Sequence, residues 1–147
     1  MCKKLVSILF ILIPFFGIAQ NEIPDSVYQK IIKTDCDGKV FTRVETLPAL
    51  KDGTAAYADS ITNYLKTKNV SFSNVKVAFR FLVTSKSQLL NMGKEPGIVL
   101  NEAVLREALE NFSALWIPAK QNDRIVCAYV RCELEFIDNK LTVRLSQ

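Results

Sequence analysis

The 147-residue chain contains no histidine and only five glycines. Histidine is the commonest general base and the commonest metal ligand, so its absence removes the usual centre of both kinds of site. None of the glycines falls in a GxGxxG or GxxxxGK pattern, which argues against a nucleotide-binding phosphate loop. No pair of cysteines has zinc-finger spacing. The sequence therefore predicts a protein that is not an enzyme and that uses no cofactor and no metal.

The chain also lacks a concentration of positive charge. It has 19 Lys and Arg residues against 15 Asp and Glu, and the cations are scattered among the acids. A nucleic-acid-binding protein needs its basic residues clustered on one face. We therefore expect no nucleic-acid partner.

Residues 1–19 have the three-part layout of a secretory signal peptide. Lys3 and Lys4 form a positive start, an apolar run follows from Leu5 to Ile18, and small residues lead to Ala19. The apolar run is roughly 14 residues long, which is shorter than the ~20 that a membrane-spanning helix needs. We expect cleavage after Ala19 and a periplasmic or secreted protein. The alternative is an uncleaved leader that acts as a membrane anchor, the only membrane attachment that the sequence suggests.

Three cysteines remain after the leader: Cys36, Cys127 and Cys132. An oxidising compartment permits one disulfide with one thiol left over; the alternative is three free thiols. Cys127 and Cys132 are five positions apart, so on one strand they face opposite sides. The one on the exposed side is easier for Cys36 to reach. We favour a Cys36–Cys127 disulfide.

The remaining sequence divides into an N-terminal extension at 20–38 and one domain at 39–147. Residues 20–35 show no clear period, and 40–44 suits a short strand. Helix patterns begin at Thr54 and Asn101, and strand patterns cover 75–83, 88–92, 124–136 and 141–145. This order predicts an α+β fold, an antiparallel sheet of three to four strands with two helices packed on one face.

The most specific pattern lies between Val99 and Phe136. It comprises a helix-opening run at Leu100–Arg106, the segment Trp116–Ala119, an Asn122-Asp123 turn, and a long strand that ends in Leu-Glu-Phe at 134–136. These features resemble the C-terminal domain of the TonB family, with its Leu-Asp-Glu-Ala-like run, Trp-x-Pro-Ala segment, Asn-Gly turn and final apolar-x-Phe. The resemblance covers residues 40–137.

Three of the matched residues also have a structural interpretation, which we prefer. Trp116 is expected to be a large core side chain where the second helix meets the sheet. Pro118 is expected to fix the exit of that helix, and Phe136 to close the last strand of the motif. The motif thus indicates a fold before it indicates a function.

The segment before the domain differs from that of the family. Family transducers carry a membrane anchor and a long proline-rich linker, whereas residues 20–38 contain a single proline, Pro24. The resemblance thus implies a shortened, stand-alone relative that binds a protein. The alternatives are an anchored energy transducer for TonB-dependent transport and a secreted structural or homodimerising domain that uses its sheet edge for self-association.

The resemblance also implies where a partner binds. In the family, an extended peptide from an outer-membrane transporter is added to the edge of the sheet. Carried over, the edge strand is 124–136, with Arg124, Tyr129, Arg131 and Glu133 as the partner-binding side chains. If the final hairpin strand at 141–145 covers this edge, the site is blocked or moves to 141–145.

Overall fold

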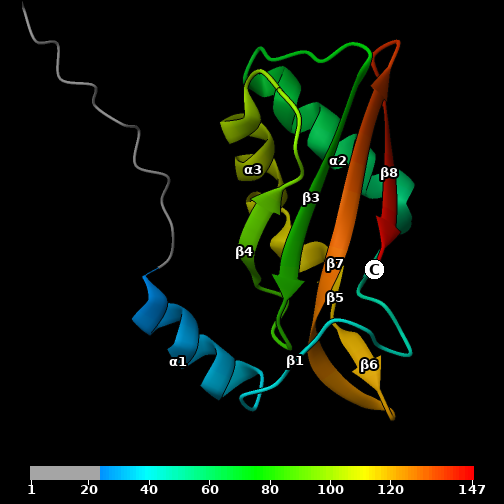
Figure 1. The fold of residues 1–147 in the computed structure, drawn as a ribbon. Helices are drawn as coiled ribbons and strands as arrows, with labels where there is room; N and C mark the ends of the chain where they lie inside the picture. The colour runs from blue at the N-terminus through cyan, green and yellow to red at the C-terminus, as the bar shows by residue number, and fades with distance from the viewer. Residues whose placement is uncertain (1–23) are drawn as a thin grey trace, which may run out of the picture.

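The computed structural model describes residues 24–147, which form helices on both faces of a central sheet (Figure 1). The predicted signal peptide lies outside the described residues. In chain order the elements are α1 (Asp25–Asp35), β1 (Val40–Phe41), β2 (Ala49–Leu50), α2 (Gly53–Thr67), β3 (Val75–Val83), β4 (Leu89–Lys94), α3 (Glu102–Asn111), the 3-10 helix η1 (Ser113–Leu115), β5 (Trp116–Ile117), β6 (Ala119–Gln121), β7 (Arg124–Ile137) and β8 (Lys140–Ser146).

The 14-residue strand β7 organises the sheet. It pairs antiparallel with β3 along residues 128–136 and with β8 along residues 131–137. The short strands β1 and β6 also pair with β7, β1 in parallel and β6 through a tight hairpin, and β4 lies outside β3. A separate two-stranded sheet joins β2 to β5.

Two hairpins owe their register to Asn and Asp residues. Asn122 and Asp123 have φ angles of 49° and 59°, and Asp138 and Asn139 have 47° and 62°. Two successive residues with positive φ are the requirement of the tight turns that match the twist of paired strands, and Asn and Asp tolerate that backbone conformation. The turn at Asn122-Asp123 is therefore as the sequence predicted.

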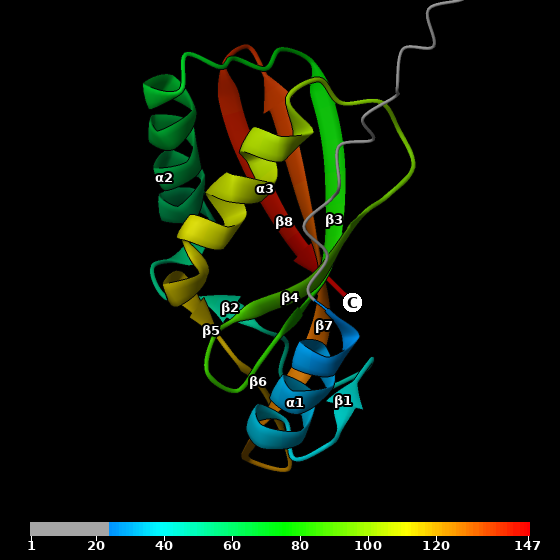
Figure 2. The ribbon, with the colours of Figure 1, turned by 90° about the vertical axis from the view of Figure 1, so that its left-hand side faces the viewer.

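The core lies between the sheet and the helices α2 and α3, which cover the same face (Figure 2). The two helices bury one apolar stripe each, Tyr57, Ala58, Ile61 and Leu65 on α2 and Leu105, Ala108 and Leu109 on α3. They pack against alternate residues of β3 and β7 because successive strand residues face opposite sides.

The helix α1 lies on the opposite face of the sheet. Its Tyr28, Ile31 and Ile32 pack in a second apolar cluster with Leu82 and Leu90. Since Leu82 follows Phe81 of the main core along β3, this cluster is on the other side. A disulfide joins Cys36, just after α1, to Cys127 of β7, with the two Cα atoms 5.4 Å apart.

The predicted α+β class is confirmed, but the predicted layout is wrong. The sheet has six strands and is mixed, since β1 runs parallel to β7, and a third α-helix packs on its second face. The strand expected at 40–44 is present as β1. The missed strands β2, β5 and β6 are two or three residues long, which is too short to show an alternating pattern. None of the helices in residues 24–147 is both long and apolar enough to cross a membrane.

Candidate functional site

The strand predicted to bind a partner is in the interior of the sheet. Each residue from 131 to 136 has a partner in β3 on one side and a partner in β8 on the other. Both rows of backbone groups are thus used within the chain, and a guest strand has no place to pair. The prediction that 124–136 is the binding edge is therefore wrong, because the final hairpin strand covers it.

The four side chains assigned to that edge do not form one site. Arg124 is exposed at the tip of the β6–β7 hairpin, and the hydroxyl of Tyr129 accepts a hydrogen bond from Nδ2 of Asn91 at 2.9 Å. Glu133 is buried and ion-paired rather than projecting outward. Of the four, only Arg131 lines a pocket at a border of the sheet.

That border is the side of β3 next to β4. The ladder between the two strands runs from Val83 and Leu89 to Phe79 and Lys94, and its last bond goes from the N–H of Glu95 to the carbonyl of Ala78 at 2.9 Å. Pro96 then has no N–H to donate, and Gly97 adopts a φ of 142°. The chain turns away, so within residues 24–147 the first three residues of β3, 75–77, have no neighbouring strand on this side.

The exposed part of this border offers backbone groups to a partner. Residues two apart in a strand direct their N–H and C=O groups to the same side. Since the carbonyl of Ala78 points to β4, both the N–H and the C=O of Lys76 point to the open border. Within residues 24–147, no backbone hydrogen bond reaches Lys76 from that side.

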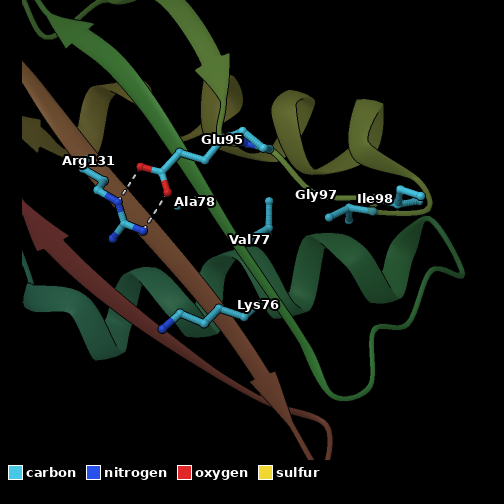
Figure 3. Close-up of a pocket in the computed structure, with 9 residues that line it drawn as sticks. Lys76, Val77, Ala78, Glu95, Gly97, Ile98 and Arg131 are labelled. Carbon is cyan, nitrogen blue, oxygen red and sulfur yellow. Dashed lines mark hydrogen bonds and ion pairs between the residues drawn. The ribbon is translucent and has the colours of Figure 1, made fainter.

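A pocket of about 160 Å³ lies along this border (Figure 3). Its walls are residues 76–78 of β3, the loop 95–99, and Arg131. The loop also carries apolar side chains into solvent, since Ile98 is 97% exposed and Leu100 is 79% exposed.

Ion pairs fix the wall of the pocket. The guanidinium of Arg131 contacts both carboxylate oxygens of Glu95, as the dashed lines in Figure 3 show, and its third nitrogen lies 2.9 Å from Glu133. The hydrogen bond from Arg131 lowers the pKa of Glu95, and the two carboxylates raise the pKa of Arg131. Glu95 begins the loop, so this pair ties the loop to the central strand.

A second carboxylate holds the neighbouring strands together. Glu133 lies 2.9 Å from Nζ of Lys76 and 3.5 Å from Nη1 of Arg144. Hydrogen bonds from Lys76 and then Arg131 hold the pKa of Glu133 below its ordinary value. The carboxylate therefore stays ionised at neutral pH and connects β3, β7 and β8.

Between residues 24 and 147, no three His, Cys, Asp or Glu residues are grouped to hold a metal ion. Cys132 is a free thiol, but burial raises its pKa to about 12, so it stays protonated and unreactive. What the border offers is main-chain hydrogen bonding.

The three residues expected to be structural lie away from the pocket. Trp116 is fully buried, and its Nε1 donates to the hydroxyl of Tyr57 at 3.2 Å. Pro118 separates β5 from β6, and Phe136 stacks at 4.8 Å from Phe72. Sequence reasoning missed Lys76 and the loop 95–99. The signal was the Pro-Gly pair at 96–97, which ends β4 after six residues while β3 has nine.

Comparison with known proteins identifies no relative of this chain. The chain matches no protein-family model, no curated protein and no solved structure.

Proposed function

We propose that the chain is an exported, non-enzymatic protein-binding module that pairs an extended peptide with the open border of β3. The observation that carries the proposal concerns the N–H and C=O of Lys76: among the described residues they have no backbone partner, and they face a pocket instead of a strand. Addition of a strand to an exposed sheet edge obtains its affinity from main-chain hydrogen bonds and its specificity from alternate side chains.

The resemblance to the TonB C-terminal domain supports the kind of partner. It rests on Trp116–Ala119, the turn after it and the strand that ends at Phe136, and it implies an extended peptide of an envelope or outer-membrane protein. The signal-peptide pattern at 1–19 supports the same compartment. We therefore assign the chain as a TonB-like module whose binding border is β3 rather than β7.

The guest peptide would occupy the place where a longer β4 would continue. Every second side chain of the guest would lie beside Lys76 and Ala78 on one face of the sheet. The remaining side chains would lie on the opposite face, which is the face that carries Val77. Ile98, on the loop that lines the pocket, would cover the guest from outside. Such a peptide needs an extended segment of only a few residues.

Proline substitution at residue 76 tests this geometry. Lys76→Pro removes the N–H that faces the open border, and it spares the ladder with β7, which uses the neighbouring residues. Lys76→Ala is the matched control, because it removes the same side chain and retains the N–H. We expect the proline variant to bind about tenfold more weakly than the alanine variant, from loss of one hydrogen bond and the bulk of the ring.

The probes are fluorescent peptides from the N-terminal segments of outer-membrane transporters of the same cell, with binding measured by anisotropy. Circular dichroism confirms that both variants are folded. A second readout needs no variant: bound peptide should slow hydrogen exchange of the Lys76 amide. Equal affinity for the two variants, or unchanged exchange at Lys76 when the peptide is bound, would overturn the proposal.

A further inference from the structure

The strand β8 forms the other border of the sheet. Its seven residues pair with β7 from Ile137 and Lys140 to Arg131 and Ser146 without any irregularity. In the part of the chain that the structure describes, no strand lies beyond β8, as Figure 1 shows. It contains neither proline nor glycine. One side of β8 therefore presents a regular row of unpaired backbone groups.

The side chains of β8 divide cleanly between the two faces of the sheet. Leu141, Val143 and Leu145 face the helices, and Leu145 is only partly buried there. The other face carries Lys140, Thr142, Arg144 and Ser146. Suppose that a second copy pairs antiparallel with β8 about a twofold axis. Residues directly opposite one another must then lie on the same face of the sheet. This holds only if the axis passes through a residue and not between two residues.

Charge and length single out one register. With the axis at Thr142, Lys140 lies opposite Arg144 of the partner copy; with the axis at Arg144, that arginine faces itself. Like charges in direct opposition destabilise a strand pair. With the axis at Val143, all seven residues are paired, Arg144 lies opposite Thr142, and Lys140 lies opposite Ser146. This register also places Leu141 opposite Leu145, which extends the apolar row.

We propose that two copies of the chain join through β8, antiparallel about a twofold axis at Val143, to form one continuous sheet. The interface is isologous, the arrangement of most soluble homodimers. This inference does not rest on the proposed peptide site. The open border of β3 lies on the far side of the sheet, so each copy of the dimer keeps it.

Cysteine pairing tests the register directly. In the proposed dimer, residue 142 lies opposite residue 144 of the partner, within the Cα separation that a disulfide spans, whereas two copies of residue 142 are about 7–8 Å apart diagonally. We expect an equimolar mixture of Thr142→Cys and Arg144→Cys proteins to form a covalent dimer on mild oxidation. Neither variant alone should do so. The native cysteines do not interfere, because Cys36 and Cys127 are bonded and Cys132 is buried.

A charge substitution tests the same register in solution. Ser146→Lys places a lysine opposite Lys140 of the partner twice in each dimer. We expect the dissociation constant of the dimer to be about 2- to 30-fold higher for this variant. Sedimentation of the protein as purified from the cells that produce it measures this constant. Ser71→Lys adds the same charge at an exposed loop position and should leave the dimer unchanged. A wild-type protein that remains monomeric at high micromolar concentration, or a mixture that forms no covalent dimer, would overturn the proposal.

Discussion

Arg131 holds Glu95 through two parallel contacts, from Nε to Oε1 at 2.6 Å and from Nη2 to Oε2 at 2.8 Å. The arginine belongs to the central strand, and the carboxylate belongs to the first residue after β4. A paired guanidinium and carboxylate fix orientation as well as distance. This pair therefore determines where the loop 95–99 stands relative to the open border of β3.

We predict that Arg131→Gln loosens the loop without unfolding the protein. Glutamine cannot make the two parallel contacts, so the loop loses its tie to β7. Hydrogen exchange at residues 97–99 should become severalfold faster, and peptide affinity should fall. Arg124→Gln, at the exposed tip of another hairpin, is the control and should change neither. Unaltered exchange in the loop of the Arg131 variant would contradict the assigned role.

Stability should fall in acid because of Glu95 and Glu133. Both carboxyl groups have a folded-state pKa below their ordinary value of 4.5, through hydrogen bonds from Arg131 and Lys76. The unfolded chain then binds more protons as the pH falls, so the stabilisation present above pH 4.5 is lost below it. Thermal melts between pH 7 and pH 3 measure the loss. Arg131→Gln should flatten this dependence; an unchanged slope in the variant would rule out the pair as its source.

The hydrogen bond between Trp116 and Tyr57 should contribute to stability. Tyr57→Phe removes the acceptor and leaves the buried indole N–H unpaired, at a cost of about 1–3 kcal/mol in the free energy of unfolding. Urea denaturation measures this cost. A double-mutant cycle with Trp116→Phe separates the bond from the packing of either ring. Additive effects in the cycle would show that the two side chains are not coupled.

Removal of the disulfide should release α1 from the sheet. The bond joins two residues that are 91 positions apart in the sequence, and loss of a native disulfide typically costs about 2–5 kcal/mol. We expect Cys36→Ser with Cys127→Ser to unfold at lower urea concentration and to exchange faster over 25–35. Cys132→Ala is a control that alters a cysteine but not the bond. Retention of slow exchange in α1 would mean that Tyr28, Ile31 and Ile32 suffice to hold the helix.

The long helices and strands were predictable because the spacing of apolar residues in each one identifies its type. Val75–Val83 alternates along nine residues, and the apolar residues of α2 and α3 recur every third or fourth position, so their burial follows from the sequence alone. The helix α1 was missed because its inward face is short. Tyr28, Ile31 and Ile32 become a stripe only when Leu82 and Leu90 cover them.

The binding border was mispredicted for a different reason. Alternation shows which face of a strand is buried but not which strands lie beside it. The pattern of 124–136 fits an edge strand and a central strand equally well, and the pairing of Lys140–Ser146 with residues 131–137 decides between them. The open border depends on where β4 stops, which Pro96 and Gly97 determine.

The bond between Cys36 and Cys127 also sets the path of mechanical load through the fold. A pull applied between the segment before Cys36 and the segment after Cys127 passes through the sulfur atoms, so the intervening stretch of the chain cannot be extended. The tension enters directly at β7, the strand with the most neighbours. A tether on the N-terminal side would therefore load the backbone of β7 directly, while β3 and β4 lie inside the closed loop and are bypassed by the pull.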